Sequence, residues 1–168
     1  MSHQTRIFDL INQFNKEYGL PNHDFAASPY VEFALGEEMS ITLSYDDASD
    51  QLIAFSEVEQ LNDHPSPNVL KKLLCANWFW QETAGATLSL EGASNQLFLS
   101  QKFHAAALNR TEELVQRFET LVDQVRHWRE SLQEEQGGAA PETPHTAGLH
   151  QITAVENPSI PPMPWNFA

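Results

Sequence analysis

The chain has 168 residues, which suits one domain of ordinary size and is too short for two independent hydrophobic cores. Nine Lys and Arg against 23 Asp and Glu give a formal net charge of −14. Because nucleic-acid backbones and anionic membranes repel such a surface, we expect neither as a partner. The simplest explanation of the charge is that it keeps the protein soluble.

The cysteine count and the N-terminal sequence predict a cytoplasmic protein. The single cysteine, Cys75, cannot form an intramolecular disulfide. The first residues lack the apolar segment and cleavage site of a signal peptide, and no apolar run reaches membrane-spanning length. Because Cys75 lies in the apolar run LLCANW, we expect its thiol to be buried and unreactive.

The first predicted element is an amphipathic helix over residues 5–18, which Gly19 and Pro21 end. Its apolar face consists of Ile7, Leu10, Ile11, Phe14 and Tyr18. Residues 30–35, 39–45 and 51–58 then alternate between apolar and polar side chains, as half-buried strands do. Short turns between these segments predict an antiparallel three-stranded meander.

A second helix is expected after the connector 63–67, capped by Ser66 or Asn68 and running roughly to Trp78. Gly85 separates this helix from a predicted hairpin whose strands lie within residues 86–92 and 95–103. In that hairpin we expect two leucines of the first strand to face the apolar residues of the second; these side chains are Leu88, Leu90, Leu97, Leu99 and Phe103.

A long amphipathic helix follows a sequence that resembles a capping box, residues 109–112, and ends near Gly137. Its apolar positions recur at spacings of three and four: Leu114, Phe118, Leu121, Val125, Trp128 and Leu132. We expect this helix to cover one face of the sheet, because it has too few heptads for a free coiled coil.

The resulting fold class is α+β, in the order helix, three strands, helix, two strands, helix, with one twisted antiparallel sheet packed against the helices. Residues 1–136 form the predicted domain. Residues 137–168 form a tail that holds six of the ten prolines. Its end has an extended, polyproline-like pattern that either docks in a groove or has no binding role, and its large apolar residues are Ile160, Met163, Trp165 and Phe167.

No motif for catalysis, a cofactor or a metal is present in the sequence. The seven histidines have no metal-ligand spacing, and His23 with Asp24 is typical of a turn. Glycine-rich phosphate loops and the GxSxG elbow are absent. The acidic pairs at 37–38 and 46–47 fall in predicted turns. We therefore expect a protein that binds other proteins, and an enzyme with an unrecognised site is the least favoured alternative.

The segment ANWFWQETAGATLSL, residues 76–90, raises a more specific possibility. A helix ending in L-L-x-A-N, followed by a bulky pair and Q-x-T-x-G-A-T-L-x-L, resembles the CesT/SycE-like family of type III secretion chaperones. The matching residues are Leu73, Leu74, Ala76, Asn77, Trp78, Phe79, Gln81, Thr83, Gly85, Ala86, Thr87, Leu88 and Leu90. The resemblance covers about residues 5–134, including the element order, acidic charge and small size.

The resemblance implies a homodimeric bacterial chaperone, active in the cytoplasm without nucleotide or other cofactor. Such proteins bind the N-terminal region of a secreted effector, keep it extended and deliver it to the export ATPase. A regulatory adaptor of the same fold, which sequesters a transcriptional regulator or an anti-activator, remains the alternative.

The resemblance also implies two sets of binding residues. The second helix and the strand after it would build a two-fold interface, to which we assign Leu70, Leu73, Leu74, Asn77, Trp78 and Trp80. The first helix and the sheet would contact the effector, through Leu10, Phe14, Phe33, Ile41, Leu43 and Phe55. The tail departs from the family pattern, and we expect that it masks an apolar groove until a partner arrives.

Overall fold

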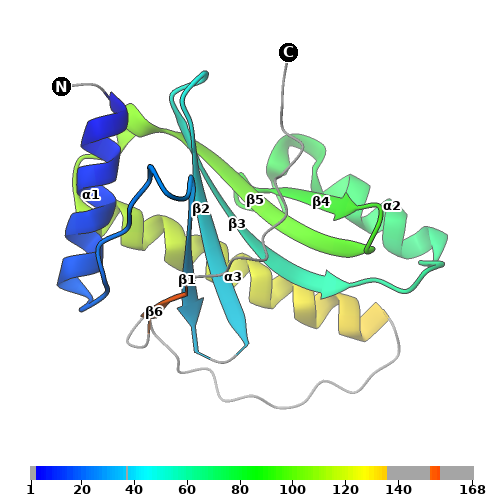
Figure 1. The fold of residues 1–168 in the computed structure, drawn as a ribbon. Helices are drawn as coiled ribbons and strands as arrows, with labels where there is room; N and C mark the ends of the chain where they lie inside the picture. The colour runs from blue at the N-terminus through cyan, green and yellow to red at the C-terminus, as the bar shows by residue number, and fades with distance from the viewer. Residues whose placement is uncertain (1–2, 37, 136–151, 156–168) are drawn as a thin grey trace.

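The computed structural model describes residues 3–36, 38–135 and 152–155. They form a six-stranded, twisted antiparallel sheet with helices packed against it, which confirms the predicted α+β class (Figure 1). In chain order the elements are α1 (His3–Glu17), β1 (Tyr30–Leu35), β2 (Met39–Asp46), β3 (Gln51–Gln60), α2 (Pro67–Ala76), η1 (Trp78–Trp80), β4 (Thr87–Glu91), β5 (Gln96–His104), η2 (Ala105–Ala107), α3 (Thr111–Glu135) and β6 (Ile152–Val155).

The strands lie in the order β4-β5-β3-β2-β1-β6. The predicted meander of β1, β2 and β3 and the predicted hairpin of β4 and β5 are both present, and β3 pairs with β5 to join them. In the hairpin, Leu88 pairs with Leu99 and Leu90 with Leu97, as the alternation predicted. The period of two therefore set the register here, because a shift of one residue would expose the buried leucines.

The sixth strand was not expected, because the sequence pattern predicts five strands and a tail over residues 137–168. Part of that tail, β6, pairs antiparallel with β1. The four apolar residues at the end of the tail, from Ile160 to Phe167, lie outside the described residues. A strand of four residues in a proline-rich segment gives too weak an alternation to be recognised from the sequence.

Helix α3 runs behind the sheet and covers one of its faces (Figure 1). All six of its predicted apolar residues are buried, and Trp128 is the largest fully buried side chain. Near its C-terminal end, Arg129 donates hydrogen bonds to the backbone carbonyls of Val58 (2.7 Å), Glu57 (3.0 Å) and Glu38 (3.1 Å). This guanidinium joins the helix to β3 and to the turn between β1 and β2.

An aromatic cluster joins α1 to α3 and the sheet. The ring centroid of Phe14 lies 5.3 Å from that of Phe33 and 5.6 Å from that of Phe118, in edge-to-face geometry. The helix ends at Glu17, one residue before the predicted end, and Gly19 follows with a φ of 70° that disfavours residues with a Cβ atom. The first helix is thus a part of the core.

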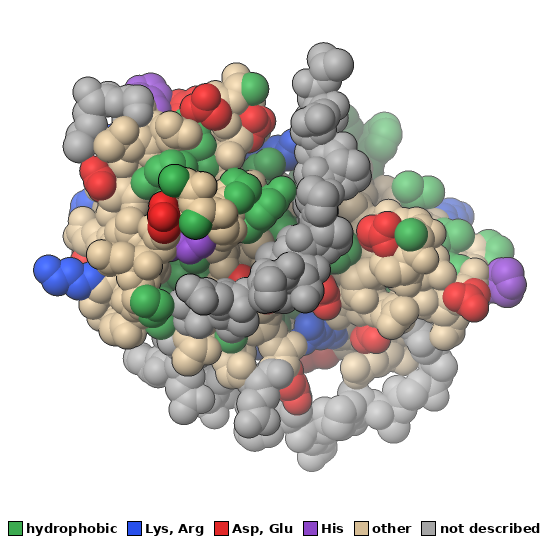
Figure 2. Space-filling view, viewed as in Figure 1, with side chains coloured by type: hydrophobic (Ala, Val, Ile, Leu, Met, Phe, Trp, Pro, Cys, Tyr) green, Lys and Arg blue, Asp and Glu red, His purple; other side chains and the backbone are tan. Residues whose placement is uncertain are grey.

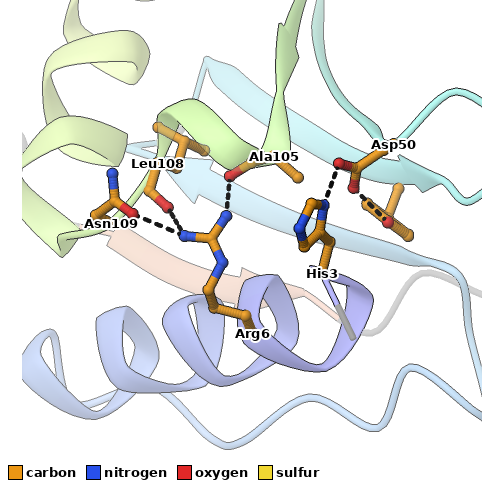
Figure 3. A network of polar contacts seen from close by, with 7 residues as sticks. His3, Arg6, Asp50, Ala105, Leu108 and Asn109 are labelled. Carbon is orange, nitrogen blue, oxygen red and sulfur yellow. Dashed lines mark hydrogen bonds and ion pairs between the residues drawn. The ribbon is translucent and has the colours of Figure 1, made fainter. Parts of the chain in front are cut away.

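Polar contacts fix the N-terminal part of α1 (Figure 3). Arg6 donates to the carbonyls of Leu108 (2.6 Å) and Ala105 (2.5 Å) and to Oδ1 of Asn109 (2.9 Å). One turn away, His3 Nδ1 lies 2.6 Å from the Asp50 carboxylate in the turn between β2 and β3. The two side chains attach the N-terminal turns of α1 to segments far away in the sequence.

Candidate functional site

The main candidate site is an apolar surface on α2 and η1, here called the α2–η1 patch and defined by Leu70, Leu74, Trp78, Phe79 and Trp80. Leu74 is 74% exposed, Trp78 72% and Phe79 68%. In Figure 2, hydrophobic side chains show on the side of the molecule that carries α2 in Figure 1. A group of large apolar side chains exposed together is typical of a protein interaction site, whereas single exposed ones need no explanation.

The patch exists because α2 is apolar on two sides. Ser66 caps the helix by accepting a hydrogen bond from the backbone N–H of Val69, which confirms one of the two predicted caps. Val69, Leu73 and Ala76 point into the core, whereas Leu70 and Leu74 lie on the outer side. Residues spaced by four share a face of a helix, so Leu70, Leu74 and the following Trp78 continue one outward row.

The backbone turns the three aromatic residues outward. The expected α-helix to Trp78 instead ends at Ala76, and the 3-10 turn η1 holds the aromatics. Phe79 and Trp80 adopt left-handed conformations with φ of 52° and 53°, and Ala84 follows with 49°. Each such residue costs about 1–2 kcal/mol relative to a right-handed one, and backbone strain of this kind is concentrated at functional sites.

Three side chains hold this strained segment in place, and two of them donate hydrogen bonds to β4. Asn77 donates to the carbonyl of Leu88 (3.0 Å) and accepts from its N–H (2.9 Å). The indole of Trp80 donates to Thr87 Oγ1 at 3.0 Å, and buried Thr83 donates to the carbonyl of Ala86 at 2.5 Å. These bonds explain how the chain keeps the aromatics exposed in one arrangement.

An open hollow of about 680 Å³ lies along the outer side of α2, with Leu70, Leu74, Cys75 and Trp78 in its lining. The expectation of a buried Cys75 is wrong, because the thiol is exposed on this side. The run LLCANW suggested burial on every side, but only every third or fourth residue of a surface helix faces the core. On the same helix, Nζ of Lys72 donates hydrogen bonds to α3, at Oε1 of Glu135 (3.2 Å) and at the carbonyl of Ser131 (3.4 Å).

Five of the six predicted interface residues face this surface or support it. The patch contains four of them: Leu70, Leu74, Trp78 and Trp80. Asn77 supports the patch by its hydrogen bond to Leu88. Leu73 is the exception, because it is only 7% exposed and belongs to the core. Phe79, which was not among the predicted interface residues, also lies on this exposed surface, and its place between two tryptophans was a usable signal.

The predicted effector-binding residues are placed differently. Five of the six are core residues with at most 7% exposure: Leu10, Phe14, Phe33, Ile41 and Leu43. Because other parts of the chain cover these side chains, they belong to the hydrophobic core and do not line a binding groove, which corrects their assignment. Phe55 remains, half-buried on the opposite face of the sheet. The alternation showed which residues share a face but could not show which face α3 covers.

Phe55 has apolar neighbours on that face of the sheet. Its ring lies 6.2 Å from that of Phe98 on β5, in edge-to-face geometry. Ile53, two residues before Phe55 on β3, is also half-buried, and Thr42 and Ser100 pair with Phe55 on either side. Ile53 and Phe98 were not among the predicted contact residues, because the other faces of their strands also carry apolar residues.

A second hollow, of about 430 Å³, lies between α1 and the loop that follows it. Phe8 stacks on Phe25 there, with ring centroids 3.9 Å apart. The expected turn at His23 and Asp24 is present: Asp24 accepts from the N–H of Ala26 at 2.9 Å, and His23 contacts the carbonyl of Ser28 at 2.9 Å. The pair thus orders the loop beside α1.

The described residues contain no group of three or more His, Cys, Asp or Glu placed to hold a metal ion. None of the described helices is both long enough and apolar enough to span a membrane. Acidic side chains are scattered across the face seen in Figure 2.

The fold is shared with solved structures of low sequence identity. A chain in the crystal structure of the ExsC–ExsE complex matches with a TM-score of 0.67 at 18% identity, covering 77% of this chain and 96% of that one. The HopA1–SchA chaperone–effector complex gives 0.61 at 22% identity, covering 76% and 97%. The Yersinia pestis type III secretion chaperone SycH, in complex with a stable fragment of YscM2, gives 0.57 at 16%, covering 73% and 98%.

Among curated proteins, none matches the sequence significantly. The family model of the Tir chaperone protein (CesT) family, in contrast, matches residues 9–129. That range runs from α1 into α3 and contains the whole α2–η1 patch. It confirms the resemblance carried by residues 76–90, and the chain therefore belongs to the Tir chaperone protein (CesT) family.

Proposed function

We propose that the chain is a type III secretion chaperone of the bacterial cytoplasm. It binds the N-terminal region of one or more secreted effectors, keeps that region soluble and extended, and delivers it to the export ATPase. It acts by binding alone, without turnover or cofactor. The observation that carries this proposal is the family match over residues 9–129, together with a fold like that of chains solved in chaperone–effector complexes.

We assign the α2–η1 patch to a homodimer interface. An isologous contact places the same surface of two copies against itself, and an apolar outer row such as Leu70, Leu74 and Trp78 suits that arrangement. Aromatic residues are enriched in the cores of such interfaces. A net charge of −14 keeps other copies apart where no apolar contact compensates for the repulsion.

We assign effector contact to the face of the sheet that carries Phe55. Ile53 and Phe98 extend it, and a half-buried apolar surface between polar neighbours can accept an apolar side chain of an extended segment. The acidic surface around it keeps the complex soluble.

The test is to capture the tagged chain from its own host under secretion-inducing conditions and to quantify what is bound. We expect one or more secreted proteins, each with two copies of this chain. Recovery of only a transcriptional regulator or an anti-activator would favour the adaptor of the same fold. Recovery of no partner at all would contradict both functions.

A further inference from the structure

The edge of β1 is occupied by a segment of the chain's own tail. β6, drawn in orange in Figure 1, lies beside β1 and pairs with it antiparallel. Residue 152 pairs with Leu35 and residue 155 with Glu32. Without β6, β1 would be an edge strand, whose free N–H and C=O groups accept any extended segment of suitable register.

One feature of this contact is unfavourable. Within the described residues β1 pairs with β6 from Glu32 to Leu35, and Oε2 of Glu32 is buried there and accepts no hydrogen bond. A buried acceptor without a donor is destabilising, and a segment that supplies a donor there would remove this penalty.

The chain connection suits an intramolecular occupant. Leu35, at the end of β1, is close in sequence to Glu38, whose carbonyl lies 3.1 Å from Arg129 Nη1 on α3. From Arg129 the helix continues only to Glu135, roughly 9 Å further at 1.5 Å per residue. The connecting residues 136–151 can span roughly 50 Å when extended, so they reach the start of β6 easily.

We propose that residues 152–155 are an intramolecular placeholder on the edge of β1, where a partner adds an extended segment that carries a basic or hydroxyl side chain opposite Glu32. This inference rests on the proposed partner-binding function. The partner segment displaces β6 and pairs with β1 in its place. The placeholder protects the edge from aggregation until then, and it lowers the apparent affinity for weak partners.

The first test measures access to the edge with a fluorescein-labelled peptide of the chain's own residues 149–158. Neighbouring residues of a strand direct their N–H groups to opposite sides, so Thr153→Pro combined with Ala154→Pro removes a donor toward β1. We expect the full-length double variant to bind the peptide about tenfold more tightly than the wild type, by fluorescence anisotropy. Thr153→Ala, at an exposed side chain, is the control and should bind like the wild type.

Equal peptide binding by the wild type and the double variant would show that residues 152–155 do not occupy the edge. Binding to neither protein would show that the edge accepts no strand. Either result overturns the proposal, provided that circular dichroism shows both proteins to be folded.

The second test concerns Glu32. A peptide with Val155→Lys places an ammonium group at the position paired with Glu32, and residues paired directly share a face of the sheet. We expect it to bind the double variant about three- to fivefold more tightly than the unmodified peptide. The advantage should disappear in a triple variant that adds Glu32→Gln. Equal affinities of both peptides for the double variant would overturn the role of Glu32.

The third test links residues 152–155 covalently to β1. Ala34 and Thr153 pair directly, so cysteines at both positions, in a Cys75→Ser background, can form a cross-strand disulfide. We expect oxidation to give an intramolecular cross-link that abolishes peptide binding, and reductant to restore it. A covalent dimer would show that the strand comes from a second copy, which overturns the intramolecular placeholder.

The peptide experiments do not depend on the natural partner. If they succeed and the capture experiment recovers no secreted protein, the proposed function fails while the placeholder stands. If effectors are captured but the peptide binds the wild type and the double variant equally, the placeholder fails alone.

Discussion

At the scale of single residues, Asp50 joins three segments of the chain. Its carboxylate contacts His3 of α1 at 2.6 Å and accepts from the hydroxyl of Tyr45 at 2.8 Å, and its carbonyl accepts from the N–H of Ala105. Its φ of 51° is in the left-handed region. The hydrogen bond to His3, followed by that to Tyr45, lowers the pKa of Asp50.

We predict that Asp50→Asn lowers the thermal stability most at neutral pH. Because the folded-state pKa lies below the unfolded value of about 3.9, the stabilisation is present above the unfolded pKa and is lost as the pH falls through the folded one. The difference in Tm between wild type and variant should therefore shrink below about pH 4.

Differential scanning calorimetry from pH 7 to pH 3 would check this. Asp47→Asn changes an exposed carboxylate of the same turn and serves as the control, with a smaller effect at pH 7. A constant Tm difference for Asp50→Asn across the range would contradict the prediction.

Burial is the main cause that raises the pKa of Tyr45, to about 12. The contribution of the protonated Tyr45 hydroxyl to the stability of the fold is therefore complete below pH 10 and is lost only as the pH rises through about 12.

At the scale of elements, α2 and η1 combine two roles within a short segment. The inner side of α2 fills the core through Val69, Leu73 and Ala76, and the outer side forms the α2–η1 patch. The strained aromatic turn keeps its shape because Asn77 pairs with both backbone groups of Leu88. The assignment of Asn77 as an interface residue stays a prediction, while its bracing of β4 is observed.

We predict that Leu74→Asp yields a folded monomer. Leu74 is 74% exposed, so in a single copy the change should alter the free energy of unfolding by only about 0.5 kcal/mol. In the proposed dimer the same carboxylate would be buried against an apolar surface and would prevent association. Multi-angle light scattering would give the mass, and circular dichroism would confirm the fold.

Leu73→Asp is the matched control from the inner side of the same helix. Its side chain is only 7% exposed, so this variant should unfold or become insoluble. A soluble dimer of Leu74→Asp, with the mass of the wild type, would exclude the α2–η1 patch as the dimer interface.

At the scale of the whole molecule, the sheet has one face that helices cover and one face to which we assign partner binding. α3 and α1 bury one face, around Phe14, Phe33 and Phe118, whereas Phe55 and Phe98 lie half-buried on the other. The sequence predicted five of the six strands and all of the long helices from apolar periodicity. Periodicity could not say which side of each strand α3 would cover, and this is why five predicted contact residues proved to be core.

We predict that Phe55→Asp reduces capture of the natural partner roughly tenfold while the chain stays folded and keeps its oligomeric state, as loss of an aromatic anchor does. Quantified co-purification from the host would measure the effect. Phe33→Asp, on the covered face with no exposed surface, should unfold the chain instead. If Phe55→Asp unfolds as well, Phe55 is a core residue and the binding face lies elsewhere.

The sequence by itself determined the fold class, the order of the three long helices and the first five strands, and the family, because apolar spacing, turn residues and the ANWFWQETAGATLSL segment are local features. Only the tertiary structure decided three further points. It showed that Cys75 is exposed, that Phe79 and Trp80 take left-handed conformations, and that residues 152–155 pair with β1. The exposure of Cys75 and the pairing of residues 152–155 depend on how distant segments pack, and the left-handed turn depends on hydrogen bonds from Asn77 and Trp80 to β4. None of these is a property of the apolar pattern.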